Sequence, residues 1–269
     1  MNKLKEFYHA QPPSLRLFVN ALFQTLFAVF IASILFPTAS GLVSVFLISF
    51  GLLHQFDNIL LENKEDIWQR NVNPVRANLK TTLRLMAIFL GIFSIYFILV
   101  SYLPAETSQK QFAKQLDSAL ATLDKKRFND FIPILQNNII VIYLFFFFSF
   151  CYRAGAIFVI TWNASVWGAT FGYISHQWAD PMLIDFVLNH LKLALAILPH
   201  LMAEAAGYIL ASMAGLFLAK AAAKYQLFSS RFNRVLHACL FLLLTSTCLV
   251  VLGVLLEAFY APLIIDLVF

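Results

Sequence analysis

The sequence has little charge and few cysteines, and both shortages limit what the protein can be. Only 12% of its 269 residues are charged, whereas 61% are hydrophobic and the mean hydropathy is +0.78, which argues against a water-soluble globule. The cysteines Cys151, Cys239 and Cys248 stand in apolar runs without CxxC or Cys/His spacing, so neither a disulfide framework nor a metal site is predicted. We therefore expect an integral membrane protein whose first partner is the lipid bilayer.

The sequence also lacks the common catalytic motifs. No GxSxG, P-loop or glycine-rich dinucleotide fingerprint occurs in a fitting context, and no HExxH is present. The formal charge of +5 comes from cations beside apolar segments, so it does not indicate nucleic-acid binding. We expect no enzyme activity, no cofactor and no metal.

Long uncharged apolar runs predict an all-α polytopic membrane protein with about seven transmembrane helices. The stretch 138–175 would be about 57 Å long as one helix, too long for a core of about 30 Å, so a turn is predicted at Arg153 to Gly155. The stretch 183–219 is interpreted as an interfacial helix followed, after a break at Pro199, by one crossing. The predicted crossings are 17–36, 42–56, 85–103, 138–152, 156–175, 199–219 and 236–258, with six or eight as alternatives.

The distribution of cations predicts the orientation. Lys3, Lys5 and Arg16 favour a cytoplasmic N-terminus, which places the polar loop 57–84 inside and the C-terminus outside. Within 104–136, the spacing of Phe112, Leu116 and Leu120 predicts an amphipathic helix near the outer surface, and 176–186 is expected as a further outer loop. The expected domains are an N-terminal hairpin with its loop, 1–84, and a membrane core, 85–269.

Ionisable side chains at membrane depth are costly unless they are paired or hydrated, and four positions qualify. These are Arg153, His200, Glu204 and Glu257. His200 and Glu204 are four residues apart and share a helix face, where Asn163 could form a hydrogen bond with either. The set has three interpretations: a buried polar cluster that fixes helix packing, a proton, ion or substrate site, or a catalytic site.

Small residues at four-residue spacing occur on two of the predicted crossings. Such series let helix backbones approach closely, so 156–175 and 199–219 are predicted neighbours with Trp162 beside their contact. The series are Ala164, Gly168 and Gly172 on the first crossing, and Gly207, Ala211 and Gly215 on the second.

Several polar motifs in order resemble the stage II sporulation protein M family over about 85–265. They are Asn137 and Asn138 opening a helix, the small-residue turn 154–156, the Trp162–Asn163 pair before Gly168, the segment PHLMAEAAGYILASMAG and the segment GVLLEAFYAP. The matching polar positions are Asn163, His200, Glu204 and Glu257. The chain departs from the family pattern at Leu201, Ala205 and Ala206, and in its extra N-terminal hairpin.

The resemblance implies a core of five transmembrane helices with an outer loop after the first. It also implies a role like that of the family's namesake, a scaffold that helps to localise peptidoglycan-degrading partners. The first hypothesis is thus a non-enzymatic scaffold that organises membrane or cell-envelope proteins. In it, Asn137, Asn138, Arg153 and Trp162 support the intramembrane set of Asn163, His200, Glu204 and Glu257. The alternative is a transporter or channel-like protein in which Asn163, His200, Glu204 and Glu257 form an ion, proton or small-molecule site.

Overall fold

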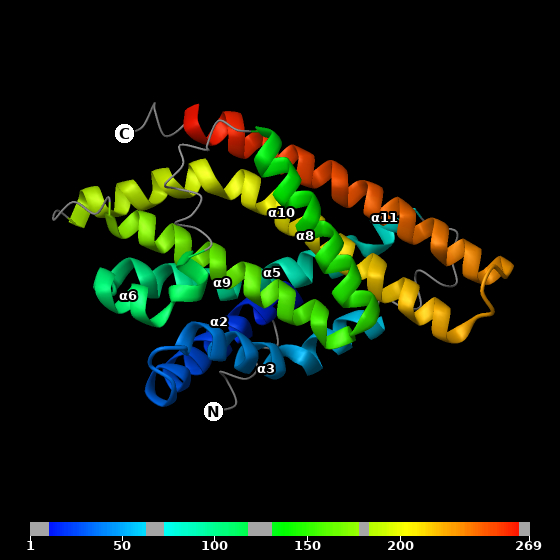
Figure 1. The fold of residues 1–269 in the computed structure, drawn as a ribbon, viewed down its shortest axis with the longest axis horizontal. Helices are drawn as coiled ribbons and strands as arrows, with labels where there is room; N and C mark the ends of the chain where they lie inside the picture. Colours follow the sequence, from blue (N-terminus) through cyan, green and yellow to red (C-terminus); the bar gives the residue numbers. More distant parts are fainter. Residues whose placement is uncertain (1–10, 63–72, 118–130, 178–182, 264–269) are drawn as a thin grey trace. The chain divides into compact units, whose positions relative to one another are not determined.

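The described part of the chain is built from helices. A computed structural model describes residues 11–62, 73–117, 131–177 and 183–263, and no strand occurs within these ranges. Figure 1 shows the helices in chain order. They are α2 (Pro13–Leu35), α3 (Ser40–Glu62), α5 (Pro74–Tyr102), α6 (Ala105–Gln111), α8 (Phe131–Cys151), α9 (Arg153–Gln177), α10 (Leu183–Lys224), α11 (Ser230–Leu255) and the π-helix η2 (Leu256–Tyr260).

Six stretches among the described residues are long and apolar enough to cross a membrane, which confirms the all-helical membrane fold. They are Pro13–Leu35, Ser40–Ile59, Pro74–Tyr102, Phe131–Cys151, Leu191–Lys224 and Ser230–Leu263. The predicted crossing at 156–175 corresponds to α9, which is not among the six. Its Trp162, Asn163 and several Thr, Ser and Gly residues lower its hydropathy. A count of seven crossings is therefore not confirmed.

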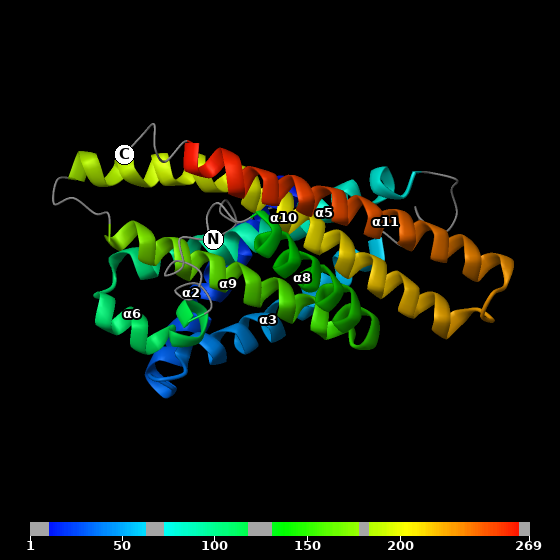
Figure 2. The ribbon, with the colours of Figure 1, turned by 45° about the horizontal axis from the view of Figure 1, so that its top comes forward.

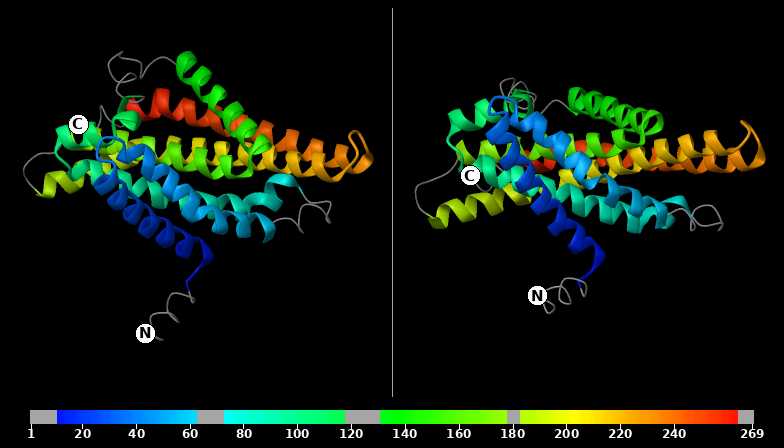
Figure 3. Two further views of the ribbon diagram at one scale, coloured as in Figure 1. Left: turned by 60° about the horizontal axis from the view of Figure 1, so that its bottom comes forward. Right: turned by 90° about the horizontal axis from the view of Figure 1, so that it is seen from below.

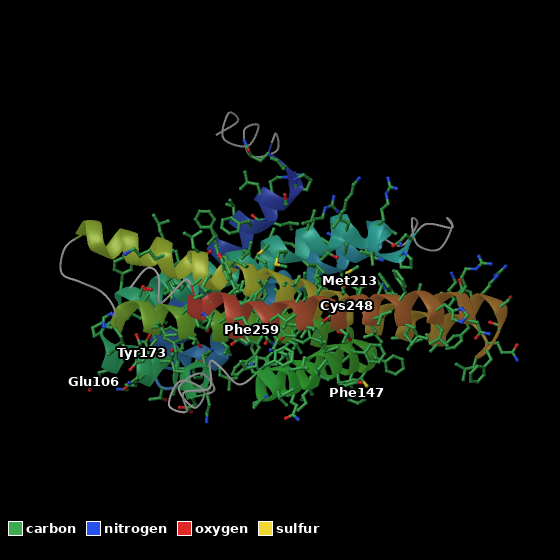
Figure 4. All side chains as sticks on the ribbon, turned by 90° about the horizontal axis from the view of Figure 1, so that it is seen from above. Glu106, Phe147, Tyr173, Met213, Cys248 and Phe259 are labelled. Carbon is green, nitrogen blue, oxygen red and sulfur yellow. The ribbon has the colours of Figure 1, made fainter. Side chains whose placement is uncertain are left out.

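The six stretches expose many large apolar side chains, and small or polar residues are among those that they bury. On α2, Phe23, Phe27 and Phe30 are exposed, whereas Ala21 and Thr25 are fully buried. On α8, Phe147 lies on the outer side of the helix and is 59% exposed (Figure 4). This distribution suits helices that pack through small residues and face lipid with bulky ones.

The chain forms two compact units. The first consists of residues 1–72, 77–119 and 160–176, and the second of residues 73–76, 120–159 and 177–269. The sequence-based division at residue 84 is a different partition, and it stays a prediction.

In the first unit, α2 and α3 form the predicted N-terminal hairpin (Figure 3). Tyr96 of α5 is fully buried, and its hydroxyl lies 2.6 Å from that of Ser44 on α3. The ring of Phe112 packs edge-on against Tyr96, and Leu116 is also buried. The apolar face of the predicted amphipathic segment is thus packed inside this unit. The prediction for Leu120 and the rest of 118–130 lies outside the described residues.

The polar loop predicted at 57–84 is wrong in its extent. Helix α3 continues to Glu62 and α5 begins at Pro74, so most of the described part of this segment is helical. Lys and Arg are good helix formers, and a helix backbone continues into water at no hydrogen-bonding cost. The outer loop predicted at 176–186 is also shorter than expected, because α9 reaches Gln177 and α10 starts at Leu183.

In the second unit, α10 and α11 pack side by side along most of their lengths, and α8 packs against both (Figures 1 and 2). The predicted turn after residue 152 is present, since α8 ends at Cys151 and α9 begins at Arg153. The predicted break at Pro199 is wrong. Pro199 lies inside one helix of 42 residues, whose length of about 63 Å is twice the thickness of a bilayer core.

Candidate functional site

A group of buried polar side chains lies where α8, α10 and α11 meet in the second unit. The side-chain nitrogen of Asn138 on α8 donates a hydrogen bond to Oε1 of Glu204 on α10, at 3.3 Å. The Tyr208 hydroxyl donates to the side-chain oxygen of Asn138. Asn138 is 6% exposed, and Glu204 and Tyr208 are 2% exposed. We call these three residues the polar cluster.

The spacing of residues on α10 explains how the polar cluster forms. Glu204 and Tyr208 are four residues apart, so they lie on the same face and both reach Asn138. The ring of Tyr208 stacks on the ring of Phe145 on α8, and the two ring centres are 5.0 Å apart. Phe145 is itself buried. An apolar ring contact therefore holds the hydroxyl against the amide.

The two other predicted ionisable residues of this region lie beside the polar cluster. His200 is buried and shares the face of Glu204, one helical turn earlier. Glu257 is half-buried on η2, which packs against α10. Gly253 of α11 packs against the Cγ atom of Glu204, and its absent side chain leaves the space that the glutamate fills. The site thus contains two carboxyl groups, an amide, a phenol and an imidazole.

Two irregular helix segments flank these side chains. Pro199 has no backbone N–H, so it cannot donate to the carbonyl of Leu195 one turn earlier. The Tyr260 hydroxyl, at the end of the π-helix, lies 3.5 Å from that carbonyl oxygen and donates to it. The π-helix η2 thereby supplies a donor to the part of α10 where the backbone hydrogen bond is missing.

The predicted packing glycines do lie at close helix contacts, but with partners other than those predicted. Gly207 packs on Val250 and on the carbonyl of Ser246. The Ser246 hydroxyl in turn donates a hydrogen bond to the carbonyl of Gly207, at 2.8 Å. Gly215 packs on the backbone of α8 at Phe146. Ala211, between them, is fully buried.

The glycines of α9 behave in the same way within the first unit. Gly168 packs on the carbonyl of Phe93, and Gly172 on the carbonyl of Phe97, both on α5. Spacing alone identified residues that permit close approach, but it does not encode which helix approaches.

The predicted site residues are distributed over both units. Asn138, predicted only as a support, is central to the polar cluster, while its neighbour Asn137 is exposed. Asn163 and Trp162 are half-buried on α9 in the first unit, so the hydrogen bond predicted between Asn163 and His200 or Glu204 stays a prediction. The side chain of Arg153 lies outside the described residues.

Tyr208 is the residue that the sequence reasoning missed. Its position four residues after Glu204, on the face already predicted to be polar, was the available signal.

The chemistry open to the site follows from its donor set. Among the described residues, no three His, Cys, Asp or Glu side chains are grouped so as to hold a metal ion. The polar atoms of Asn138, Glu204 and Tyr208 instead bind one another across two helices, an arrangement that fixes helix register.

Comparison with curated proteins finds no match, and comparison with solved structures finds none either. Comparison with protein families does find one. The model described as Stage II sporulation protein M matches residues 83–262, which is two thirds of the chain and includes most of α5 and all of α6, α8, α9, α10, α11 and η2. Together with the six apolar helices, this match identifies an integral membrane protein of the stage II sporulation protein M family.

Proposed function

We propose that this protein is a non-enzymatic scaffold in the cell membrane, which organises membrane or cell-envelope proteins around a rigid helical core. The observation that carries the proposal is the hydrogen bonding of the polar cluster. Asn138 uses both ends of its amide to bind Glu204 and Tyr208, so these buried polar groups stabilise helix packing. Such a role needs no bound substrate.

The close helix contacts support the same function. Gly207, Gly215 and Gly253 each let a neighbouring helix approach to a distance that a larger residue would prevent. A core with three such contacts favours one arrangement of α8, α10 and α11. A scaffold requires a fixed arrangement, because its partners must be held in a constant geometry.

The segment 104–117 is the partner-binding surface in this proposal. Phe112 and Leu116 anchor it in the first unit, while Glu106, Lys110 and Lys114 are exposed. With the N-terminus in the cytoplasm and the C-terminus outside, as the charge distribution favours, this surface faces the outer side, where cell-envelope proteins are reached.

Cysteine accessibility tests the role of the polar cluster. Single cysteines at Asn138, Glu204, Tyr208 and Glu257, in a cysteine-free background, are treated with a membrane-impermeant thiol reagent. Cysteines at the exposed residues Glu106 and Lys224 serve as controls, and we expect them to label from opposite sides. A scaffold core predicts that the four test positions stay unlabelled. Labelling of all four from one side would contradict the proposal and favour the transporter alternative.

Photo-crosslinking tests the partner-binding surface. A photoreactive amino acid at Lys110 or Lys114 should give a discrete adduct with a cell-envelope protein in growing cells. The same amino acid at Phe147, which is exposed on α8, is the matched control and should crosslink to lipid. Identical adducts from all three positions, or none from Lys110 and Lys114, would contradict the scaffold proposal.

A further inference from the structure

The end of the α10–α11 hairpin carries four cations and no acidic residue. They are Lys220 and Lys224 on α10, and Arg231 and Arg234 on α11. Between Glu204 and Glu257 the sequence contains no Asp or Glu at all. The hairpin end projects past the end of α8 in every view (Figures 1 to 3), and nitrogen-bearing side chains surround it (Figure 4). This end of the second unit is therefore uniformly positive.

The antiparallel packing of the two helices places the cations in two levels. Gly207 contacts Ser246 and Val250, and Glu204 contacts Gly253. Continuing this register toward the hairpin end brings Lys220 level with Arg234, and Lys224 level with Arg231. Ala221, Phe232 and Val235 are buried, so the two helices stay in contact over this part.

The length of the apolar stretch sets the depth of these levels. Residues 235–256, from α11 to the first residue of η2, contain no charged side chain, and 22 residues at about 1.5 Å each span about 33 Å, close to the thickness of a bilayer core. Arg234 and Lys220 therefore lie at its boundary. Arg231 and Lys224 lie about 4.5–6 Å farther out, at the depth of lipid head groups.

The turn between the helices holds the cations in a defined arrangement. Ser229 caps α11 by accepting a hydrogen bond from the backbone N–H of Phe232, and the Asn233 side chain donates to the carbonyl of Phe228 at 3.2 Å. Phe228 has a φ of +61°, which a bulky residue rarely adopts without such contacts. Lys224, Arg231 and Arg234 are exposed, so their charged groups are accessible.

We propose that this hairpin end is a binding site for the head groups of anionic phospholipids. The lysine and arginine side chains would donate hydrogen bonds to lipid phosphate oxygens at the level where those oxygens lie. Leu227 and Phe228, which are 58% and 78% exposed at the outermost point, are not needed for this interaction. The proposal is independent of the scaffold function, because it concerns residues outside the polar cluster and outside 104–117.

The association of spin-labelled lipids tests the proposal. The full chain is reconstituted in phosphatidylcholine vesicles, and the relative association of spin-labelled phosphatidylglycerol and spin-labelled phosphatidylcholine is measured. We expect a preference of at least about threefold for phosphatidylglycerol. This preference should largely disappear in the variant K220Q/K224Q/R231Q/R234Q, which lacks the four positive charges. It should also weaken in about 1 M salt, because the charges are screened.

Three matched variants keep the result interpretable. K220R/K224R/R231K/R234K conserves charge and should retain the preference, and K224Q/R231Q, limited to exposed positions, should lose part of it even if the fourfold variant fails to fold. L227S/F228S should leave it unchanged. A fourfold variant that folds and keeps the full preference would overturn the proposal. Loss of the preference in L227S/F228S alone would also overturn it and would indicate an apolar partner.

Discussion

Asn138 and Glu204 form a hydrogen bond of 3.3 Å between two helices, across 66 positions of sequence. The Asn138 amide also accepts a hydrogen bond from Tyr208, so one residue of α8 satisfies two residues of α10. We expect Asn138→Leu to lower the free energy of unfolding by about 1–3 kcal/mol, because Glu204 and Tyr208 would be left buried without this partner. Unfolding of the purified protein in mixed detergent micelles measures the change.

The adjacent residue provides the control for this experiment. Asn137→Leu makes the same chemical change at an exposed position and should alter stability by less than about 0.5 kcal/mol. The combined variant N138L/E204L/Y208F should recover much of the lost stability, because replacing every member of a buried polar set by apolar groups is often neutral. Equal effects of the Asn137 and Asn138 substitutions would show that the hydrogen bonds of Asn138 contribute little.

Gly215 of α10 lies at a close contact with the backbone of α8. A Cβ atom there would overlap the Phe146 carbonyl oxygen and would lie 3.1 Å from the backbone nitrogen of Phe150. Backbone atoms of a helix cannot move singly, so we expect Gly215→Ala to cost about 1–3 kcal/mol despite the better helix propensity of alanine. The measurement is again unfolding in detergent, with Ala203→Leu, at a half-exposed position of α10, as a control expected to be nearly neutral.

The stability lost in Gly253→Ala, unlike that lost in Gly215→Ala, should be partly restored by a second substitution. The Cβ atom that Gly253→Ala adds would meet the Cγ atom of Glu204, which is a side chain rather than backbone. Glu204→Ala should therefore relieve the overlap, so the double variant is expected to lose less stability than the sum of the two single variants. A double-mutant cycle measures this coupling. Strictly additive losses would contradict the contact between Gly253 and Glu204.

A buried hydroxyl pair in the first unit gives an independent prediction. Tyr96 is fully buried, and its hydroxyl lies 2.6 Å from that of Ser44, which links α5 to α3. Tyr96→Phe should cost about 0.5–1.5 kcal/mol through the lost hydrogen bond. Tyr143→Phe, at a position that is 68% exposed, makes the same chemical change and should be nearly neutral in the same unfolding assay.

The sequence predicted the membrane fold because its signals are local. Apolar runs and the turn near Arg153 depend on neighbouring residues, and both agree with the structure. The break predicted at Pro199 was wrong because proline removes only one backbone hydrogen bond. A packed helix can continue through it when the freed carbonyl finds a donor such as Tyr260.

The partners of the site residues were harder to predict because they depend on tertiary contacts. Glu204 and Asn138 could be selected as costly polar residues in an apolar segment. That they bind each other, and that Gly253 makes room for Glu204, depends on the register between α8, α10 and α11, which no residue spacing within one helix encodes. The glycines illustrate the same limit, since their spacing predicted close contacts without specifying the helix in contact.

Pro199 and Tyr260 should be energetically coupled through the Leu195 carbonyl oxygen. In the native chain that oxygen receives the Tyr260 hydroxyl at 3.5 Å, because residue 199 has no N–H to offer. Pro199→Ala supplies an N–H, so the tyrosine hydroxyl becomes redundant. We therefore expect Tyr260→Phe to cost about 0.5 kcal/mol, the low end for a long hydrogen bond, in the native background, and nothing measurable in the Pro199→Ala background. Pro199→Ala alone should raise the helix content of α10 or leave it unchanged. If Tyr260→Phe has the same effect in both backgrounds, the hydroxyl does not compensate for the proline, and the continuity of α10 must come from apolar packing alone.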